Sequence, residues 1–237
     1  MRSIFATSVS LGIMLSIIGA TPSVAGGSSA GQPAAPLIRL PDPIVSGNLS
    51  VESAMHRRRS VRNFARQPLR LAEASQLLWA AQGVTAPDGK RTAPSAGALY
   101  PLEIYFAAGE VSGLAKGVYQ YQPLEHALRR VADGDRRTAL AAAALGQDWL
   151  SEAAAVIVVA AVYRRTTGKY GQRGMRYAHL EAGHTAQNIS LQAVALNLGT
   201  VVVGAFDDDK VKNIVNMSGD EQPLCILPIG RTRHAAQ

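Results

Sequence analysis

The sequence of 237 residues contains a single cysteine, Cys225, and therefore cannot form an intramolecular disulfide. Stability must come from a packed core, and Cys225, inside an apolar run at 223–229, is expected to be a small buried hydrophobe. The sequence also lacks Cys/His metal-ligand spacing, a G-x-G-x-x-G motif and a G-x-x-x-x-G-K-[ST] motif. These absences exclude a disulfide scaffold, a Rossmann dinucleotide site and a P-loop, and no metal site is expected.

Charged residues are few, at 17% of the sequence against 47% hydrophobic residues, which is ordinary for a globular protein and argues against extensive disorder. Lys and Arg (24) outnumber Asp and Glu (17), and the formal net charge of +7 favours an anionic ligand. Outside one cluster the basic residues are scattered, so no nucleic-acid partner is expected. The length suits one domain, and no internal repeat is present.

The N-terminus has the pattern of an export signal. One positive charge at Arg2 precedes a mostly apolar stretch at 4–18, and Ser23-Val24-Ala25 is typical of a signal-peptidase site. We expect residues 1–25 to be a Sec-type signal peptide, which leaves a periplasmic or secreted protein with no stable membrane anchor after cleavage. An uncleaved anchor is the alternative, but the apolar run is shorter than the roughly 20 residues of a spanning helix.

The rest of the chain divides by composition and periodicity. Residues 26–41 are expected to be a flexible tether, 42–233 a single folded domain, and 234–237 a tail. Capping residues and apolar spacings of three and four predict a helix from 51 that ends in the arginine cluster, helices at 71–82, 136–145 and 179–198, and a short helix from 207–209 to 215. Continuous or alternating β-branched runs predict strands at 102–108, 117–122, 153–163, 200–206 and 223–229. The domain is therefore predicted to belong to the α+β class.

One basic cluster is dense enough to bind an anion. Residues 57–64 read Arg-Arg-Arg-Ser-Val-Arg-Asn-Phe, and the guanidinium forks of Arg58 and Arg62 with the hydroxyl of Ser60 offer several hydrogen bonds to one phosphate. The alternative is a solvated helix face or a patch for nucleic acid or anionic lipid.

Two further features would support the prediction of an anion-binding site if they lie near this cluster. The loop 94–98 consists of small residues, which let the backbone approach a flat ring closely, and Arg231 directly follows the last predicted strand. Together these features predict a phosphorylated ligand with a flat headgroup, which is a mononucleotide cofactor.

The same residues carry a family resemblance. The stretch 58–64 resembles the opening signature of the FMN-dependent nitroreductase-like superfamily. Further stretches resemble its SagB-type (thiazole/oxazole-forming oxidase-like) dehydrogenase branch. They lie at 94–103, 169–174, 181–188 and 204–209, and they occur in the family's order between about 51 and 231.

The resemblance implies a nitroreductase-like fold, in which a mainly antiparallel central sheet is flanked by helices. It also implies a homodimer, with the helix 179–198 buried at the dimer interface and FMN bound there. The residues that it assigns to FMN are Arg58, Arg59, Ser60, Arg62 and Arg231 at the phosphate and ribityl chain, Pro94, Ser95, Ala96 and Gly97 bordering the ring, and Val203, Gly204 and Ala205 along the ring's other side.

In azoline-oxidising members of this branch a Lys-Tyr pair removes the substrate proton, and Lys169-Tyr170 matches that pair. Lys169 is alternatively an ordinary surface lysine in a Gly-flanked loop. His179 and His184 are five residues apart and do not share a metal-binding face, Glu181 is expected to pair with an arginine, and Asp207 to Asp209 are expected to cap a helix.

The expected function is that of an exported FMN-dependent oxidoreductase, which transfers hydride through the flavin in a ping-pong cycle. Its substrate would be a small organic donor or acceptor such as a quinone, a nitro compound or an azoline-like ring, and NAD(P)H is a candidate electron donor. Export argues against a peptide-azoline substrate and against ready access to NAD(P)H. The alternative is a non-catalytic flavin-binding or cofactor-free dimer that keeps the fold.

Overall fold

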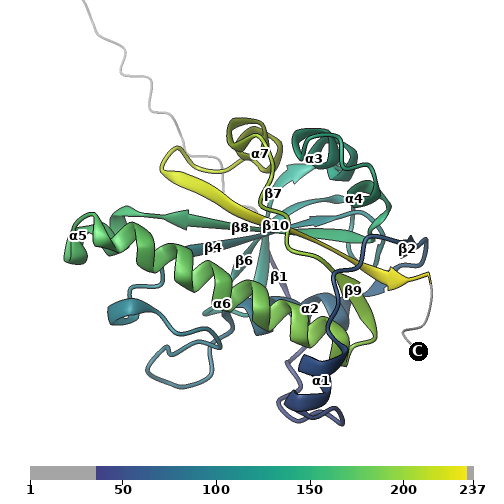
Figure 1. The fold of residues 1–237 in the computed structure, drawn as a ribbon, viewed down its shortest axis with the longest axis horizontal. Coiled ribbons are helices and arrows are strands. Elements are labelled where there is room, and N and C mark those ends of the chain that lie inside the picture. The colour runs from purple at the N-terminus through teal and green to yellow at the C-terminus, as the bar shows by residue number, and fades with distance from the viewer. Residues whose placement is uncertain (1–35, 234–237) are drawn as a thin grey trace, which may run out of the picture. The chain divides into compact units, whose positions relative to one another are not determined.

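A computed structural model of the protein describes residues 36–233, which form a mainly antiparallel sheet covered by helices on both faces (Figure 1). The strands are β1 Leu37–Arg39, β2 Phe64–Ala65, β3 Leu69–Arg70, β4 Leu102–Ala108, β5 Val111–Ser112, β6 Gly117–Gln122, β7 Ala127–Asp133, β8 Ala155–Val162, β9 Leu198–Thr200 and β10 Glu221–Thr232. The helices are α1 Val51–Arg57, α2 Leu71–Gln82, α3 Arg137–Ala143, α4 Trp149–Glu152, α5 Arg164–Tyr170, α6 Arg173–Ala195 and α7 Asp208–Val215, with a short 3₁₀-helix at Ala96–Ala98.

The main sheet has the strand order β1-β7-β6-β4-β8-β10-β2, and β9 pairs with the other edge of β10, opposite β2 at Arg231. Its strand pairings are antiparallel, whereas β3 and β5 form a small separate parallel pair. The expected fold class, a mainly antiparallel sheet flanked by helices, is confirmed.

The central strand β8 explains why the sheet has two cores. Every residue of β8 is buried, and alternate side chains point to opposite faces. Ile157 and Val159 pack with α2 and α6, whereas Val156 and Val158 pack with α3, α4 and α7. A strand covered on both faces has no polar alternation, so the continuous apolar run at 153–163 correctly predicted this position.

The predicted helix starts and ends hold where the chain carries its own caps. The Ser50 side chain accepts a hydrogen bond from the backbone of Ser53 at the start of α1, and Gly83 follows the last residue of α2. The Asp207 side chain accepts from Lys210 N at 3.0 Å and caps α7, as expected of the aspartate run.

Other boundaries were wrong. The tether expected at 26–41 ends earlier, because Leu37–Arg39 pairs with β7 and Leu40 is buried. The strand expected at 200–206 is interrupted after Thr200, whose carbonyl accepts from Val61 N, and its pairing with β10 resumes as an isolated bridge between Val203 and Ile226. The signal peptide and the C-terminal tail, with residues 26–35 of the tether, lie outside the described residues.

The longest helix also differs from its prediction at both ends. It begins at Arg173 rather than 179 and ends at Ala195, where Asn197 adopts a positive φ of 56°. One side is buried through Ala178, Ala186 and Ile189, while Leu180 on another side is 56% exposed. No helix among residues 36–233 has the length and apolarity needed to cross a membrane.

Candidate functional site

The basic cluster lies where α1 and β10 end. Arg57, Arg59 and Arg231 line a cavity of about 370 Å³, together with Val194 and Asn197 at the end of α6. The cavity brings together two of the predicted phosphate ligands, Arg59 and Arg231, which are far apart in the sequence. Its cationic lining suits an anionic group.

The other predicted phosphate ligands are placed differently. Arg58 is the C-cap of α1 and does not line this cavity. The guanidinium of Arg62 lies 5.6 Å from the centre of the Trp149 ring, in a cation–π contact. Of the arginines predicted at the phosphate, Arg59 and Arg231 therefore line the cavity, whereas Arg58 and Arg62 do not.

Ser60 lies beside a buried hydroxyl. It forms a parallel bridge with Thr200, and Val61 N donates to Thr200 O at 2.9 Å. Thr200 is only 5% exposed, and its Oγ1 has no hydrogen-bond partner among residues 36–233. A buried hydroxyl without a partner costs free energy, so an additional polar group at this edge would be stabilising. The residues present therefore fit a phosphate-bearing ligand.

Arg231 is held by a residue that the sequence reading missed. Its Nη2 donates to both carboxylate oxygens of Glu73, at 2.7 and 2.9 Å, and the Glu73 side chain is only 2% exposed. Arg70 binds the same carboxylate through its backbone N and its Nη2. Burial raises the pKa of Glu73, but the hydrogen bonds from Arg70 and Arg231 outweigh burial and lower it.

The small-residue loop at 94–98 contributes no residue to the arginine cavity. Gly97, Ala98 and Tyr100 all have positive φ angles, of 63°, 54° and 44°. Within the loop, Tyr100 N donates to Ser95 Oγ at 2.8 Å. The amide of Ala96 donates to Glu181 Oε1 at 2.9 Å, so Glu181 binds backbone rather than the arginine that we expected.

The predicted catalytic pair lies directly against this loop. A Cβ atom added to Gly97 would be 2.7 Å from Tyr170 Oη and 3.0 Å from Lys169 Nζ. Lys169 and Tyr170 form the last turn of α5, so the Gly-flanked loop expected around them is a helix. The Tyr170 ring packs edge-on against Tyr177 of α6, with 5.1 Å between ring centres.

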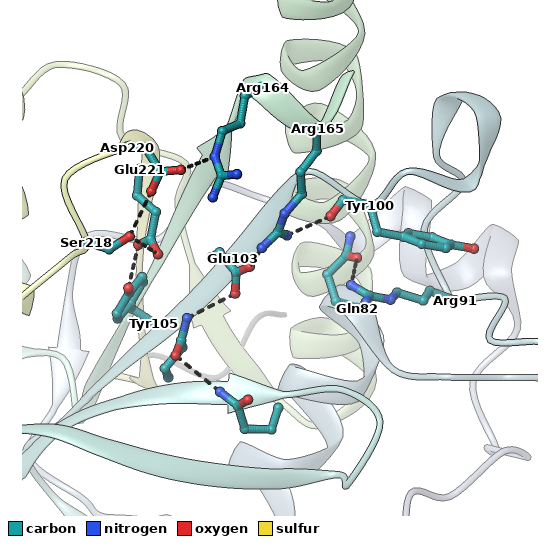
Figure 2. A network of polar contacts seen from close by, with 12 residues as sticks. Gln82, Arg91, Tyr100, Glu103, Tyr105, Arg164, Arg165, Ser218, Asp220 and Glu221 are labelled. Atoms are coloured by element: carbon teal, nitrogen blue, oxygen red, sulfur yellow. Dashed lines mark hydrogen bonds and ion pairs between the residues drawn. The ribbon is translucent and has the colours of Figure 1, made fainter. Parts of the chain in front are cut away.

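Figure 2 shows how the end of the loop is fixed. Arg165 of α5 donates to the carbonyl of Tyr100 at 3.0 Å and pairs with Glu103 of β4. On the other side of Tyr100, the guanidinium of Arg91 lies 4.4 Å from its ring centre. The loop is thus held by Arg165 of α5, which also pairs with Glu103 of β4, and by Arg91, which precedes the loop in the sequence.

The third predicted segment, Val203 to Ala205, borders a larger cavity. Val203 pairs with Ile226 of β10, and Gly204 lines a cavity of about 760 Å³ between α6 and the start of β10. A Cβ atom at Gly204 would meet nothing within 4 Å. This cavity and the arginine cavity both border α6 and β10, at different points along them.

The larger cavity contains one polar pair that the sequence reading did not single out. Tyr163 Oη and His179 Nε2 are 2.5 Å apart, and both residues line the cavity. The sequence signals for the roles of the two buried glutamates were weak. Glu73, which was not singled out, stands three residues after a helix start, a position typical of a cap. Glu181, which was expected to pair with an arginine, is an isolated acid in a helix with an Ala-rich stripe.

Fold and site define the class of protein, and comparison with known proteins agrees. The model of the nitroreductase family matches residues 55–231, so the chain belongs to the nitroreductase family, whose members are oxidoreductases. A candidate nitroreductase of Methanocaldococcus jannaschii is 46% identical over 194 residues, covering 82% of this chain and 96% of that protein. The expected family is confirmed.

The likeness extends to the SagB-type branch. The microcin B17-processing protein McbC of Escherichia coli is 29% identical over 133 residues, which cover 54% of this chain and 49% of McbC. The match thus spans about half the length of McbC.

Among solved structures, a candidate nitroreductase of Anabaena variabilis superposes with a TM-score of 0.74 at 34% identity, covering 84% of this chain and 42% of that one. The NADPH:FMN oxidoreductase of Vibrio harveyi, complexed with NAD+, has a TM-score of 0.57 at 18% identity, covering 78% and 70% of the two chains. The latter likeness shows a shared fold.

Proposed function

We propose that this protein is an exported, homodimeric FMN-dependent oxidoreductase of the SagB-type branch. The observation that carries the proposal is the cavity lined by Arg57, Arg59 and Arg231 in a nitroreductase-family chain. The cofactor is supported by that cationic lining, by the unpartnered hydroxyl of Thr200 beside Ser60, and by the fold shared with an FMN oxidoreductase.

In this proposal Arg59 and Arg231 hold the phosphate, with Arg58, Ser60 and Arg62 nearby, while 94–97 and 203–205 border the ring. Bound FMN supplies hydride exchange, taken from a donor and passed to an acceptor in a ping-pong cycle. Lys169 and Tyr170 would exchange the proton that accompanies hydride transfer, at Nζ or Oη: they take the proton that the donor loses and return one to the reduced acceptor. Glu73 keeps Arg231 oriented, and the exposed side of α6 around Leu180 contacts the second subunit.

The substrate class follows from compartment and cavity. Export, if residues 1–25 act as a signal peptide, separates the protein from the cytoplasmic NAD(P)H pool and from a peptide-cyclising partner. The cavity of about 760 Å³ is lined mainly by apolar side chains, with polar atoms at Tyr163, His179 and Asp208. A small planar acceptor, such as a quinone or a nitro compound, suits it better than a peptide azoline.

Purified mature protein tests the proposal. A yellow protein that releases FMN on denaturation is expected, and Arg59→Ala and Arg231→Ala should each weaken FMN binding at least tenfold, because each removes a charge-assisted phosphate contact. Arg233→Ala is the matched control, since Arg233 is on the same strand extension but pairs with Glu152. A colourless protein that cannot be reconstituted would instead support the cofactor-free dimer.

A further inference from the structure

The loop 94–100 is held in a backbone conformation that its residues do not favour. Ala98 and Tyr100 have positive φ angles of 54° and 44° although neither is glycine. The left-handed conformation costs a residue with a side chain about 1–2 kcal/mol. Such a loop relaxes unless neighbouring groups fix it, so the groups that bind it determine its shape.

Glu181 binds the loop through the backbone amide of Ala96. Its side chain belongs to α6, is buried at 4% exposure, and accepts the amide of Ala96 at 2.9 Å. The adjacent Ser95 hydroxyl faces the same carboxylate and accepts from Tyr100 N at 2.8 Å. A carboxylate is an acceptor with no donor of its own, which suits a cluster of amide and hydroxyl hydrogens.

On its other side the loop touches the Lys169 and Tyr170 side chains through Gly97. The contact is close enough that a methyl group at Gly97 would overlap Tyr170 Oη. We propose that Glu181 is a positioning residue, which fixes the position of the Ala96–Gly97 backbone. Because Gly97 contacts Lys169 and Tyr170, Glu181 thereby fixes Lys169 Nζ and Tyr170 Oη relative to the ring of the bound cofactor. Only the part of the inference that concerns the bound cofactor rests on the proposed function.

The electrostatic setting of Glu181 fits a positioning role. Burial raises the pKa of Glu181, and the amide of Ala96, the hydroxyl of Ser95 and the nearby His184 offset this only in part. The bond to Ala96 needs an acceptor atom at the end of a side chain of this length. Glutamine supplies one, whereas alanine does not and aspartate is one methylene shorter.

The first test measures hydrogen exchange of the Ala96 amide by NMR, in protein without added cofactor. Glu181→Ala and Glu181→Asp should speed this exchange about tenfold to a hundredfold, the range for losing a hydrogen bond to a charged group. Glu181→Gln should keep exchange within about threefold of wild type. Ser190→Ala is the matched control, because Ser190 is a buried polar residue of α6 whose hydroxyl donates to Ala186 O within the same helix.

The second test titrates the same variants with FMN and follows the quenching of flavin fluorescence. Loss of affinity of about tenfold in Glu181→Asp, wild-type affinity in Glu181→Gln and no change in Ser190→Ala support the inference. Equal exchange at Ala96 in wild type and Glu181→Asp, or equal loss in the Asp and Gln variants, overturns it. Failure of the proposed function looks different, because wild-type protein would then not bind FMN while the exchange pattern at Ala96 remained.

Discussion

Glu73 and Glu181 are both buried glutamates of helices, yet the fold satisfies them in opposite ways. Glu73 binds the charged groups of Arg70 and Arg231, and its pKa is lowered. Glu181 binds the backbone amide of Ala96 and pairs with no guanidinium among residues 36–233, and its pKa is raised by burial. The first arrangement fixes a charge in the arginine cavity, and the second fixes the backbone of a strained loop. Within one candidate site, Glu73 therefore sets the charge around Arg231, whereas Glu181 sets the backbone geometry of the loop.

The largest expected effect is the loss of stability in Glu73→Ala. Removing the carboxylate leaves Arg231 without its partner beside other arginines, and breaking a buried ion pair costs about 3 kcal/mol. Denaturant unfolding followed by circular dichroism measures it. Glu125→Ala, at an exposed turn position between β6 and β7, is the control and should leave the midpoint unchanged. Equal midpoints for the two variants would show that Glu73 contributes nothing.

A second prediction concerns Gly97→Ala. The change costs about 1 kcal/mol because Gly97 has a φ of 63°, and the new methyl group must also displace Tyr170 Oη. Gly89→Ala is the matched control, since its φ of 80° carries a similar backbone cost but a Cβ there meets nothing within 4 Å. FMN affinity should fall only in Gly97→Ala, whereas both variants lose stability. A loss of affinity shared by both would remove the argument for local contact.

The pH dependence of stability should have opposite signs for the two glutamates. Because the folded pKa of Glu73 is lowered, its ionised form stabilises the protein above the unfolded pKa of about 4.3, and this contribution is lost as pH falls. The folded pKa of Glu181 is raised above its unfolded value, so the contribution of Glu181 to the free energy of unfolding falls as pH rises through the unfolded pKa.

Melting temperatures between pH 4 and pH 8 measure this contrast. Relative to wild type, Glu73→Gln should lose more stability at pH 8 than at pH 4, and Glu181→Gln should lose less or gain. The same pH trend in both variants would mean that the two carboxylates have similar environments.

The smallest expected effect is that of Arg62→Ala. Its contact with the Trp149 ring is at an exposed position, where a cation–π interaction contributes about 0.5 kcal/mol. FMN affinity should fall less than in Arg59→Ala, because Arg59 lines the arginine cavity and Arg62 does not. Flavin fluorescence titration of the two variants decides this, and an equal loss would place both side chains at the phosphate.

Much of the fold could be predicted because local signals and tertiary structure agree. Ser50 caps α1, Gly83 follows α2, and the β-branched run of β8 is buried on both sides. The missed features depend on distant partners. Strand β1 exists because β7 is available to pair with it, and its three residues carry too little pattern to be recognised.

The candidate site was predictable as a set of residues but not as an arrangement. The arginine cluster, the small-residue loop and the pair Lys169-Tyr170 were each visible as motifs. Which arginines share a cavity was not predictable, because the backbone after α1 places Arg59 in the cavity that Arg231 also lines and Arg62 against Trp149. The roles of Glu73 and Glu181 require contacts across 158 and 85 residues of chain.

The sequence by itself determined the class of fold, the family and the residue types that could bind an anion or move a proton. These properties depend on local periodicity and on motifs whose members are close in the chain. Tertiary structure decided which of those residues meet, and which buried carboxylate holds each group in place. The physical reason is that burial and charge pairing are properties of neighbours in space, and for Glu73 and Glu181 those neighbours come from distant segments.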